Sequence, residues 1–222
     1  MMKQNPGEIL ELAYELYQKK DYKTSLEKYE WFFDNAVDID SSYIGAKYRS
    51  LREWSCLAKD YEPAHQSLIN KKNITSKLFQ KNKSKELFRD FSRLCDVLNH
   101  YQEFMNVFLK LQDSNMEFTE SIYIYIEDIL IKNRKWELCN LYIKDSIEKY
   151  NILLAKFDEL IRISNNEFNG EYNSIYEKQF EKDIQNLLWI LKVGNRDNEI
   201  NNIVSQLKND LLKRNITYTT TK

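Results

Sequence analysis

Histidine and cysteine, the side chains that most often act as nucleophiles or metal ligands, are few and scattered in this chain. His65 and His100 are its two histidines, and Cys56, Cys95 and Cys139 show no CxxC spacing. A zinc site needs several such ligands brought together, and a reactive cysteine needs an electropositive setting. Neither pattern is present. We therefore expect no catalytic residue, no metal site and no cofactor, and solvated or hydrogen-bonded histidines.

Loops that bind phosphate or expose a nucleophile are also missing. The four glycines, Gly7, Gly45, Gly170 and Gly194, lie far apart, whereas a phosphate-binding loop needs several within a few residues. No GxSxG motif occurs. The sequence therefore predicts a protein that is not an enzyme.

The composition favours long helices as the elements that position these side chains. Only 4 of 222 residues are Gly and 2 are Pro, whereas a sheet protein needs many turns built from them. Apolar residues make up 42% and charged residues 30%, which is typical of a folded, soluble protein. No apolar run long enough to span a membrane and no signal peptide is recognisable. The three cysteines are far apart and odd in number, which favours a reducing compartment. We therefore expect a cytoplasmic protein.

Charge is balanced overall, at a net −1, but it is uneven along the chain. The stretch 71–93 carries eight bases: Lys71, Lys72, Lys77, Lys81, Lys83, Lys85, Arg89 and Arg93. The following stretch, 94–130, is acidic. Such runs usually form solvated helix faces. A nucleic-acid-associated regulator that uses the basic stretch is the alternative.

A repeated aromatic landmark divides the chain into helix pairs. Tyr22, Tyr61, Tyr101, Trp136 and Tyr172 are separated by 39, 40, 35 and 36 residues. An amphipathic stretch precedes the landmark in each of the first four units, and a second one follows each landmark, most clearly in the first unit. We expect an all-α chain of about eleven helices in about five pairs. A last helix through Ile200, Ile203, Val204, Leu207 and Leu211 would cap the stack.

Local signals indicate where several helices begin and end. The expected starts are Pro6, a cap at Ser41 or Ser42, Pro63 in a first turn, and a cap at Ser84. The expected stops are Asn169–Gly170 and Gly194–Asn195. The strand-like segment 122–126 is expected to be helical, because an isolated strand would have no pairing partner. A single domain is expected over 1–214, with a disordered tail at 215–222.

The first unit has a distinctive series of apolar, aromatic and small residues: Ile9, Leu12, Ala13, Leu16, Tyr17, Tyr22, Ser25, Leu26, Tyr29, Phe32 and Phe33. In the spacing of these positions the unit resembles a tetratricopeptide repeat. Ala13 and Ser25 would be buried where the two helices cross. The second unit, through Tyr61 and Ala64, resembles uncharacterised bacterial repeat proteins, although Arg52 replaces a small residue there, as Phe104 does in the third. The resemblance implies a right-handed solenoid with a concave groove that binds a protein or peptide.

In such a stack the first helix of each pair lines the groove. The implied groove residues are Tyr14, Tyr17, Arg49, Glu53, Arg89, Arg93, Asp128 and Lys132. Arginine grips a carboxylate with two parallel hydrogen bonds, so this groove suits an extended acidic peptide or a free carboxylate. The alternative is that the arginines pair with Glu53, Asp90 and Asp96 and bind nothing.

The sequence thus predicts a binding scaffold with a protein or peptide partner, and no membrane partner. Within binding proteins, an immunity-type protein that neutralises a toxin is a second possibility, by analogy with small bacterial repeat domains. Nucleic acid is the less favoured partner, because the net charge is near zero and the acidic stretch adjoins the basic one.

Overall fold

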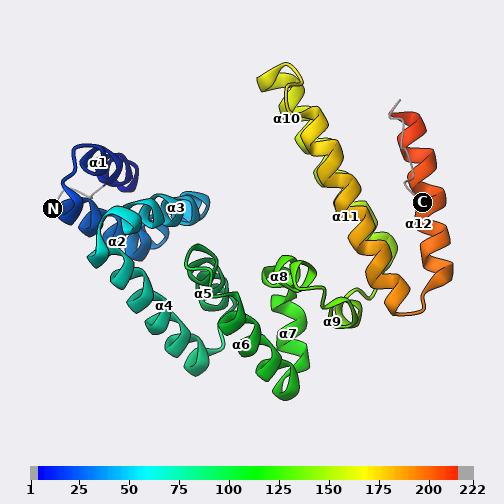
Figure 1. The fold of residues 1–222 in the computed structure, drawn as a ribbon, viewed down its shortest axis with the longest axis horizontal. Helices are drawn as coiled ribbons and strands as arrows, with labels where there is room; N and C mark the ends of the chain where they lie inside the picture. Colours follow the sequence, from blue (N-terminus) through cyan, green and yellow to red (C-terminus); the bar gives the residue numbers. More distant parts are fainter. Residues whose placement is uncertain (1–4, 215–222) are drawn as a thin grey trace. The chain divides into compact units, whose positions relative to one another are not determined.

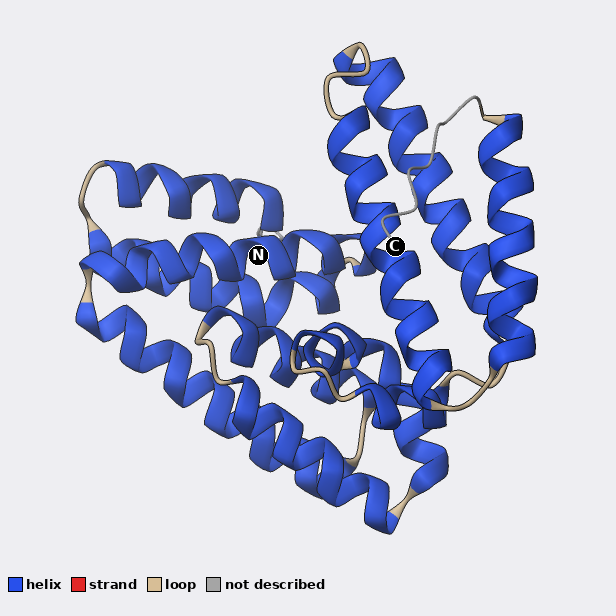
Figure 2. Cartoon of the chain, turned by 45° about the vertical axis from the view of Figure 1, so that its right-hand side comes forward, coloured by secondary structure: helices blue, strands red, loops and turns tan. Residues whose placement is uncertain are grey.

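The chain folds into helices joined by short loops (Figures 1 and 2). The computed structural model describes residues 5–214, and within that range it contains twelve α-helices, two 3-10 turns and no strand. Two compact units are separated at Ile126: Met1–Ile126 and Glu127–Lys222. The expected all-α class and the arrangement in neighbouring helix pairs are confirmed. The tail expected at 215–222 lies outside the described residues.

The first unit contains seven helices and both 3-10 turns in its described part. Their bounds are α1 Pro6–Gln18, α2 Tyr22–Ile39, η1 Ser41–Tyr43, α3 Ile44–Asp60, α4 Glu62–Asn82, α5 Lys85–Val97, α6 Tyr101–Ser114, α7 Met116–Ile122 and η2 Tyr123–Tyr125. Each helix packs on the next one along the chain. In addition α1 contacts α3, α3 contacts α5, and α5 contacts α7, so the first helices of successive pairs form one row.

The second unit is built differently. Its helices are α8 Glu127–Lys132, α9 Trp136–Tyr142, α10 Ser146–Phe168, α11 Asn173–Val193 and α12 Asp197–Lys213. The long helices α10 and α11 form a hairpin, and α12 packs on both of them. The short helix α9 packs on α8 and on α11.

All five aromatic landmarks mark the start of the second helix of a pair. Tyr22, Tyr101 and Trp136 are the first residues of α2, α6 and α9. Tyr61 and Tyr172 are the cap residues immediately before α4 and α11. The near-constant spacing of the landmarks therefore reports a real repetition of helix, turn and helix.

A recurring turn that the sequence did not reveal lies two residues before a helix start. At this position five non-glycine residues have a left-handed backbone: Lys20 (φ 64°), Lys83 (φ 50°), Asn99 (φ 57°), Arg134 (φ 53°) and Asn195 (φ 54°). In all of these turns except the one at Lys83, the next amide reaches back to an earlier carbonyl of the preceding helix; for example, Asp21 N–H donates to the Leu16 carbonyl at 2.9 Å. This is the Schellman arrangement, which satisfies carbonyls at a helix end. Lysine and arginine give no sequence signal for it.

The crossing of α1 and α2 depends on small side chains. Ala13 and Ser25 are both fully buried, as expected, and the Ser25 hydroxyl donates to the Ala13 carbonyl at 2.8 Å. This bond satisfies a buried hydroxyl that would otherwise be costly to desolvate. Trp54 of α3 is fully buried against Phe33 of α2, edge to face at 6.4 Å between ring centroids.

The third pair packs through aromatic rings instead. Phe88 of α5 lies 4.8 Å from Phe104 of α6 and 5.1 Å from Phe79 of α4, measured between ring centroids, and all three rings are fully buried. Phe104 occupies the position where a small residue was expected. The α5–α6 crossing is therefore filled by aromatic rings, which departs from the first pair.

Most of the local start and stop signals are confirmed. Pro6 begins α1, Pro63 lies in the first turn of α4, and the Ser84 hydroxyl accepts the Leu87 amide at the start of α5. The expected cap at Ser41 or Ser42 is wrong. Asp40 is the cap, because its carboxylate accepts the Ser42 amide at 2.8 Å and starts the 3-10 turn before α3.

The segment 122–126 is helical, as expected, but it is not a continuous α-helix. α7 ends at Ile122, a 3-10 turn covers Tyr123–Tyr125, and α8 begins only at Glu127. β-branched and aromatic side chains lose rotamer freedom in an α-helix, which weakens this stretch as one. The break adds a helix to the expected count and coincides with the boundary between the two units.

Candidate partner-binding face

Six of the eight predicted groove residues belong to the row formed by α1, α3 and α5. Tyr14 and Tyr17 lie on α1, Arg49 and Glu53 on α3, and Arg89 and Arg93 on α5. The remaining two, Asp128 and Lys132, are exposed residues of α8 in the second unit. The candidate face therefore belongs to the first unit alone, and we call it the α1–α3–α5 face: Tyr14, Tyr48, Arg49, Glu53, Arg89 and Arg93.

A hollow of about 420 Å³ opens between α1 and α3 on this face. Its lining residues are Leu10, Glu11, Tyr14, Glu15, Arg49 and Glu53. Tyr14 is 51% exposed, which leaves a large ring available for contact. The lining thus includes three carboxylates and one guanidinium. Glu15 pairs with Lys19 at 3.3 Å, and Glu53 accepts a long hydrogen bond from the Tyr29 hydroxyl at 3.4 Å.

Tyr17 is engaged within the fold and does not line this hollow. Its hydroxyl donates to the Asp60 carboxylate at 2.8 Å, and its ring packs on Tyr22, which packs in turn on Tyr61. The hydrogen bond to Asp60 is the main reason that the pKa of Tyr17 is raised to about 12. Tyr17 therefore ties α1 to the end of α3.

Arg89 and Arg93 both pack on one tyrosine ring. Their guanidinium carbons lie 5.4 and 5.7 Å from the centroid of Tyr48. The Tyr48 hydroxyl donates to Asp90 at 2.7 Å, and the Lys47 ammonium donates to the same carboxylate at 2.7 Å. Burial, followed by the charge of Asp90, raises the pKa of Tyr48, so its hydroxyl remains a donor at physiological pH.

The ion pairs that the alternative interpretation assigned to these arginines are not present among the described residues. Asp90 is bound by Lys47 and Tyr48, and Asp96 accepts the Tyr101 hydroxyl at 3.0 Å. Within residues 5–214, no carboxylate forms an ion pair with Arg49, Arg89 or Arg93, which we call the face arginines. The Nε atom of Arg89 is buried and has no hydrogen-bond partner in the described part of the chain.

The basic stretch 71–93 does not form a single surface. Lys71 pairs with Asp34 at 2.6 Å. Lys72 is buried, with its ammonium bound to the Glu103 carboxylate and 3.1 Å from Nδ1 of His100. Arg89 and Arg93 pack on Tyr48. The charge that remains in solvent is divided between the lysines at the end of α4 and the start of α5 and Arg93 on α5, which weakens the case for a continuous phosphate-binding surface.

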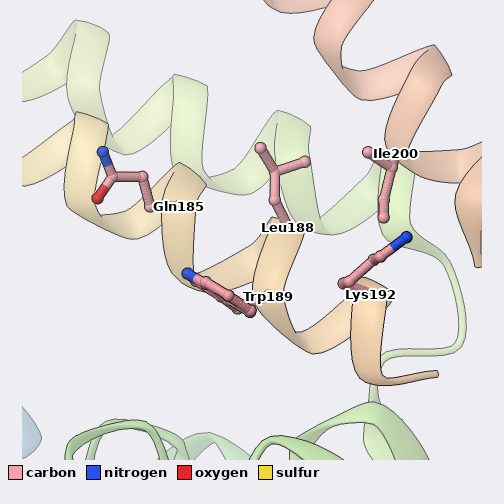
Figure 3. A pocket seen from close by; sticks show the side chains of 5 residues that line it. All are labelled: Gln185, Leu188, Trp189, Lys192 and Ile200. Carbon is pink, nitrogen blue, oxygen red and sulfur yellow. The ribbon is translucent and has the colours of Figure 1, made fainter. Parts of the chain in front are cut away.

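A second hollow lies in the second unit, and the sequence did not predict it (Figure 3). It has a volume of about 270 Å³ and is lined by Gln185, Leu188, Trp189 and Lys192 of α11 and Ile200 of α12. Trp189 is 60% exposed. A signal existed, because Trp189 falls off the stripe of buried residues formed by Ile184, Leu187 and Leu191.

His65 and the three cysteines are the remaining side chains that the sequence analysis considered for chemistry. His65 lies 3.9 Å from Glu62, and Cys95 and Cys139 are buried while Cys56 is exposed. Burial is the main reason that the pKa of Cys95 is raised to about 12, which keeps it a thiol. Among the described residues, no group of three or more potential ligands could hold a metal ion, and no helix has the length and apolar character needed to cross a membrane.

Comparison with known proteins gave no match, so the function has to be inferred from the geometry described above. No protein-family model, no curated protein and no solved structure matched the chain.

Proposed function

We propose that this chain is a non-enzymatic scaffold that binds an extended segment of another protein on the α1–α3–α5 face. The observation that carries the proposal is the state of the face arginines. All three lack a carboxylate partner from the described chain, and the acids nearest in sequence are bound to other donors. Arginines without an internal partner are available to bind one supplied from outside.

The arrangement of helices supports the same proposal. In tetratricopeptide-like solenoids the first helices of successive pairs form the concave wall, and α1, α3 and α5 form such a row in this chain. We propose that the first unit is a stack of this kind. Its hollow beside the exposed Tyr14 ring would accept a side chain of the bound segment, since tyrosine offers contact area at low entropy cost.

The test is a selection of binding peptides from a random display library on the intact protein, followed by calorimetric titration of the enriched peptides. We expect each of Arg49→Ala, Arg89→Ala and Arg93→Ala to weaken binding at least about fivefold, within the range for lost charged hydrogen bonds. The melting temperature should fall only slightly, because these side chains have no ion pair to lose and Arg89 and Arg93 lose only their contact with the Tyr48 ring.

A matched control removes three charges elsewhere on the same unit. Lys77, Lys81 and Lys85 are exposed, and the triple alanine variant should bind the selected peptides as the parent does. Peptides that bind all three arginine variants as tightly as the parent would place the site elsewhere. Salt-sensitive binding of an oligonucleotide that the triple lysine variant loses would instead favour the nucleic-acid alternative.

A further inference from the structure

The cluster of Tyr48, Arg89 and Arg93 is organised before any ligand arrives. The Tyr48 ring is held by the bond from its hydroxyl to Asp90, and Lys47, which also binds Asp90, lies 4.3 Å over the Phe33 ring. The two guanidiniums lie near the Tyr48 ring. Packing on an aromatic face restrains a guanidinium and leaves the N–H groups at its edge free to bind an acceptor.

The two arginines of this cluster form no ion pair with a carboxylate of the described chain. Lys47 and Asp90 neutralise each other, so Arg89 and Arg93 contribute two positive charges. After Asp90, the acidic residue nearest to Arg89 in the sequence is Glu86. Its carboxylate accepts a hydrogen bond from the Ser84 hydroxyl at 2.7 Å. That bond is the main reason that the pKa of Glu86 is lowered, with a smaller contribution from Arg89. The Nε of Arg89 is buried and has no acceptor among the described residues, so this guanidinium is not held by an internal partner through that atom.

The other end of the same face has the opposite charge. Three glutamates line the hollow between α1 and α3, Glu11, Glu15 and Glu53. They are opposed by Arg49 and by Lys19, which pairs with Glu15 at 3.3 Å, so the hollow keeps a net negative charge. Neighbouring helices are about 8–10 Å apart, so the distance from α1 to α5 is roughly 20 Å. An extended peptide covers that distance with about six residues. The face therefore presents acid at α1 and base at α5 over the length of a short peptide.

We propose that the Tyr48–Arg89–Arg93 cluster is a carboxylate-binding subsite, which takes the acidic end of a bound protein segment whose other end is neutral or basic. This inference rests on the proposed function and specifies its ligand. A phosphate backbone is disfavoured, because a uniformly anionic chain would meet the three glutamates of the hollow.

The experiment uses the full chain and three N-acetylated hexapeptides, of which two also end in an amide. The probe is acetyl-Lys-Ser-Gly-Ser-Glu-Glu-amide, the control replaces the lysine and both glutamates by glutamine, and a third version replaces the two glutamates by glutamine and ends in a free carboxylate. Inorganic phosphate forms a fourth arm. The readout is the side-chain Nε–Hε signal of each arginine in ¹⁵N-correlated NMR spectra, assigned with single arginine variants.

We expect the acidic probe to shift the signals of Arg89 and Arg93 in a saturable way at millimolar concentration or below, while the neutral control shifts neither. Shifts with the third peptide would identify a terminal carboxylate as a ligand too. Arg89→Gln and Arg93→Gln should each weaken binding at least tenfold. Arg89→Lys should weaken it at least threefold, because it retains the charge and loses the planar fork. Arg162→Gln, at an exposed arginine of α10, is the matched control and should have no effect.

Equal shifts with the neutral control, or no shift at 5 mM acidic probe, would overturn the inference. So would phosphate binding that equals or exceeds that of the acidic probe. Peptides selected on the whole protein that depend on Arg49 but not on Arg89 or Arg93 would leave the proposed function standing and refute this subsite alone.

Discussion

The two units use the same turn but different packing. The Schellman turn recurs at Lys20 and Asn99 in the first unit and at Arg134 and Asn195 in the second. Between these turns the first unit builds a row of similar helix pairs, whereas the second combines two short helices with a long hairpin and α12. A repeated local turn therefore does not by itself impose a repeated stack, because helix lengths and crossing residues also have to repeat.

The units also differ in what their arginines bind. In the second unit, Arg196 forms a fork with Glu199 at 2.6 and 2.7 Å and donates to the Ile143 carbonyl, and Arg214 forms a fork with Asp158 at 2.6 and 2.8 Å. The face arginines of the first unit have no such partners in the described chain. This contrast indicates that Arg196 and Arg214 hold the fold together and that the face arginines are available for a ligand.

The largest expected effect comes from the contrast between two tryptophans. Trp54 is fully buried in the first unit, so Trp54→Ala should lower the free energy of unfolding by about 3–5 kcal/mol through cavity formation. Trp189→Ala in the second unit should change it by less than about 0.5 kcal/mol, since that ring is 60% exposed. Urea denaturation of both variants measures the difference. A comparable loss for Trp189→Ala would mean that its ring is covered in solution.

The next prediction concerns the close crossing of α1 and α2 and asks whether α8 and α9 in the second unit cross as closely. Ala13 and Cys139 are both fully buried at the small-residue positions of their pairs. Ala13→Leu should destabilise by about 1–3 kcal/mol through overpacking. Cys139→Leu should show a loss of the same order if α8 and α9 cross as closely. Thermal melting measures both, and an unchanged midpoint for Cys139→Leu would confine the close crossing to the first unit.

Arginine substitutions test most directly whether the arginines of the two units differ in what they bind. Arg196→Met keeps the apolar stem but leaves the buried Ile143 with an unpaired carbonyl, so we expect a loss of about 1–2 kcal/mol in the free energy of unfolding. Arg93→Met, which removes no ion pair in the described chain, should change it by less than about 0.5 kcal/mol. Equal losses would show that Arg93 has a structural role.

The Arg196 effect should also depend on pH. Arg196 and, to a smaller extent, Ser146 lower the pKa of Glu199 below its ordinary value. A lowered carboxyl pKa contributes stability above the unfolded-state pKa, and that contribution is lost as pH falls through the folded-state value. The difference between the parent and Arg196→Met should therefore narrow below about pH 4. Denaturation at pH 7 and pH 3 checks this, and a gap that widens in acid would contradict it.

The smallest expected loss in the free energy of unfolding comes from the removal of a tyrosine hydroxyl. Tyr17→Phe removes the bond to Asp60 and should cost about 0.5–1 kcal/mol. Because the folded-state pKa of Tyr17 is about 12, above the ordinary value of about 10, its contribution is present below pH 10 and lost as pH rises through 12. An ultraviolet titration of parent and variant should differ by one tyrosine ionising near pH 12. If the tyrosine that the variant lacks ionises near pH 10 in the parent, the hydrogen bond to Asp60 would be contradicted. Tyr150, buried in the second unit and bonded to Asp210, should ionise at higher pH still.

The sequence alone determined the features that depend on neighbours within one helical turn. Landmarks such as Tyr22 and Tyr101, the prolines of α1 and α4, and the Ser84 cap could be predicted because a helix start is set by local hydrogen bonds and backbone angles. The spacing of the landmarks likewise placed six of the eight predicted groove residues on α1, α3 and α5. The left-handed Lys20 and Arg134 were missed, since neither residue type favours that conformation.

Only the tertiary structure decided which of these side chains have partners. Asp90 could have paired with Arg89 or Arg93 on its own helix, but Lys47 and Tyr48, more than 40 residues earlier, bind it instead. Trp189 could have been buried, and the stretch around Tyr123 could have continued as one helix. Each outcome depends on how closely residues distant in the sequence approach, and a helical pattern records which side of a helix a residue occupies without recording what packs against it.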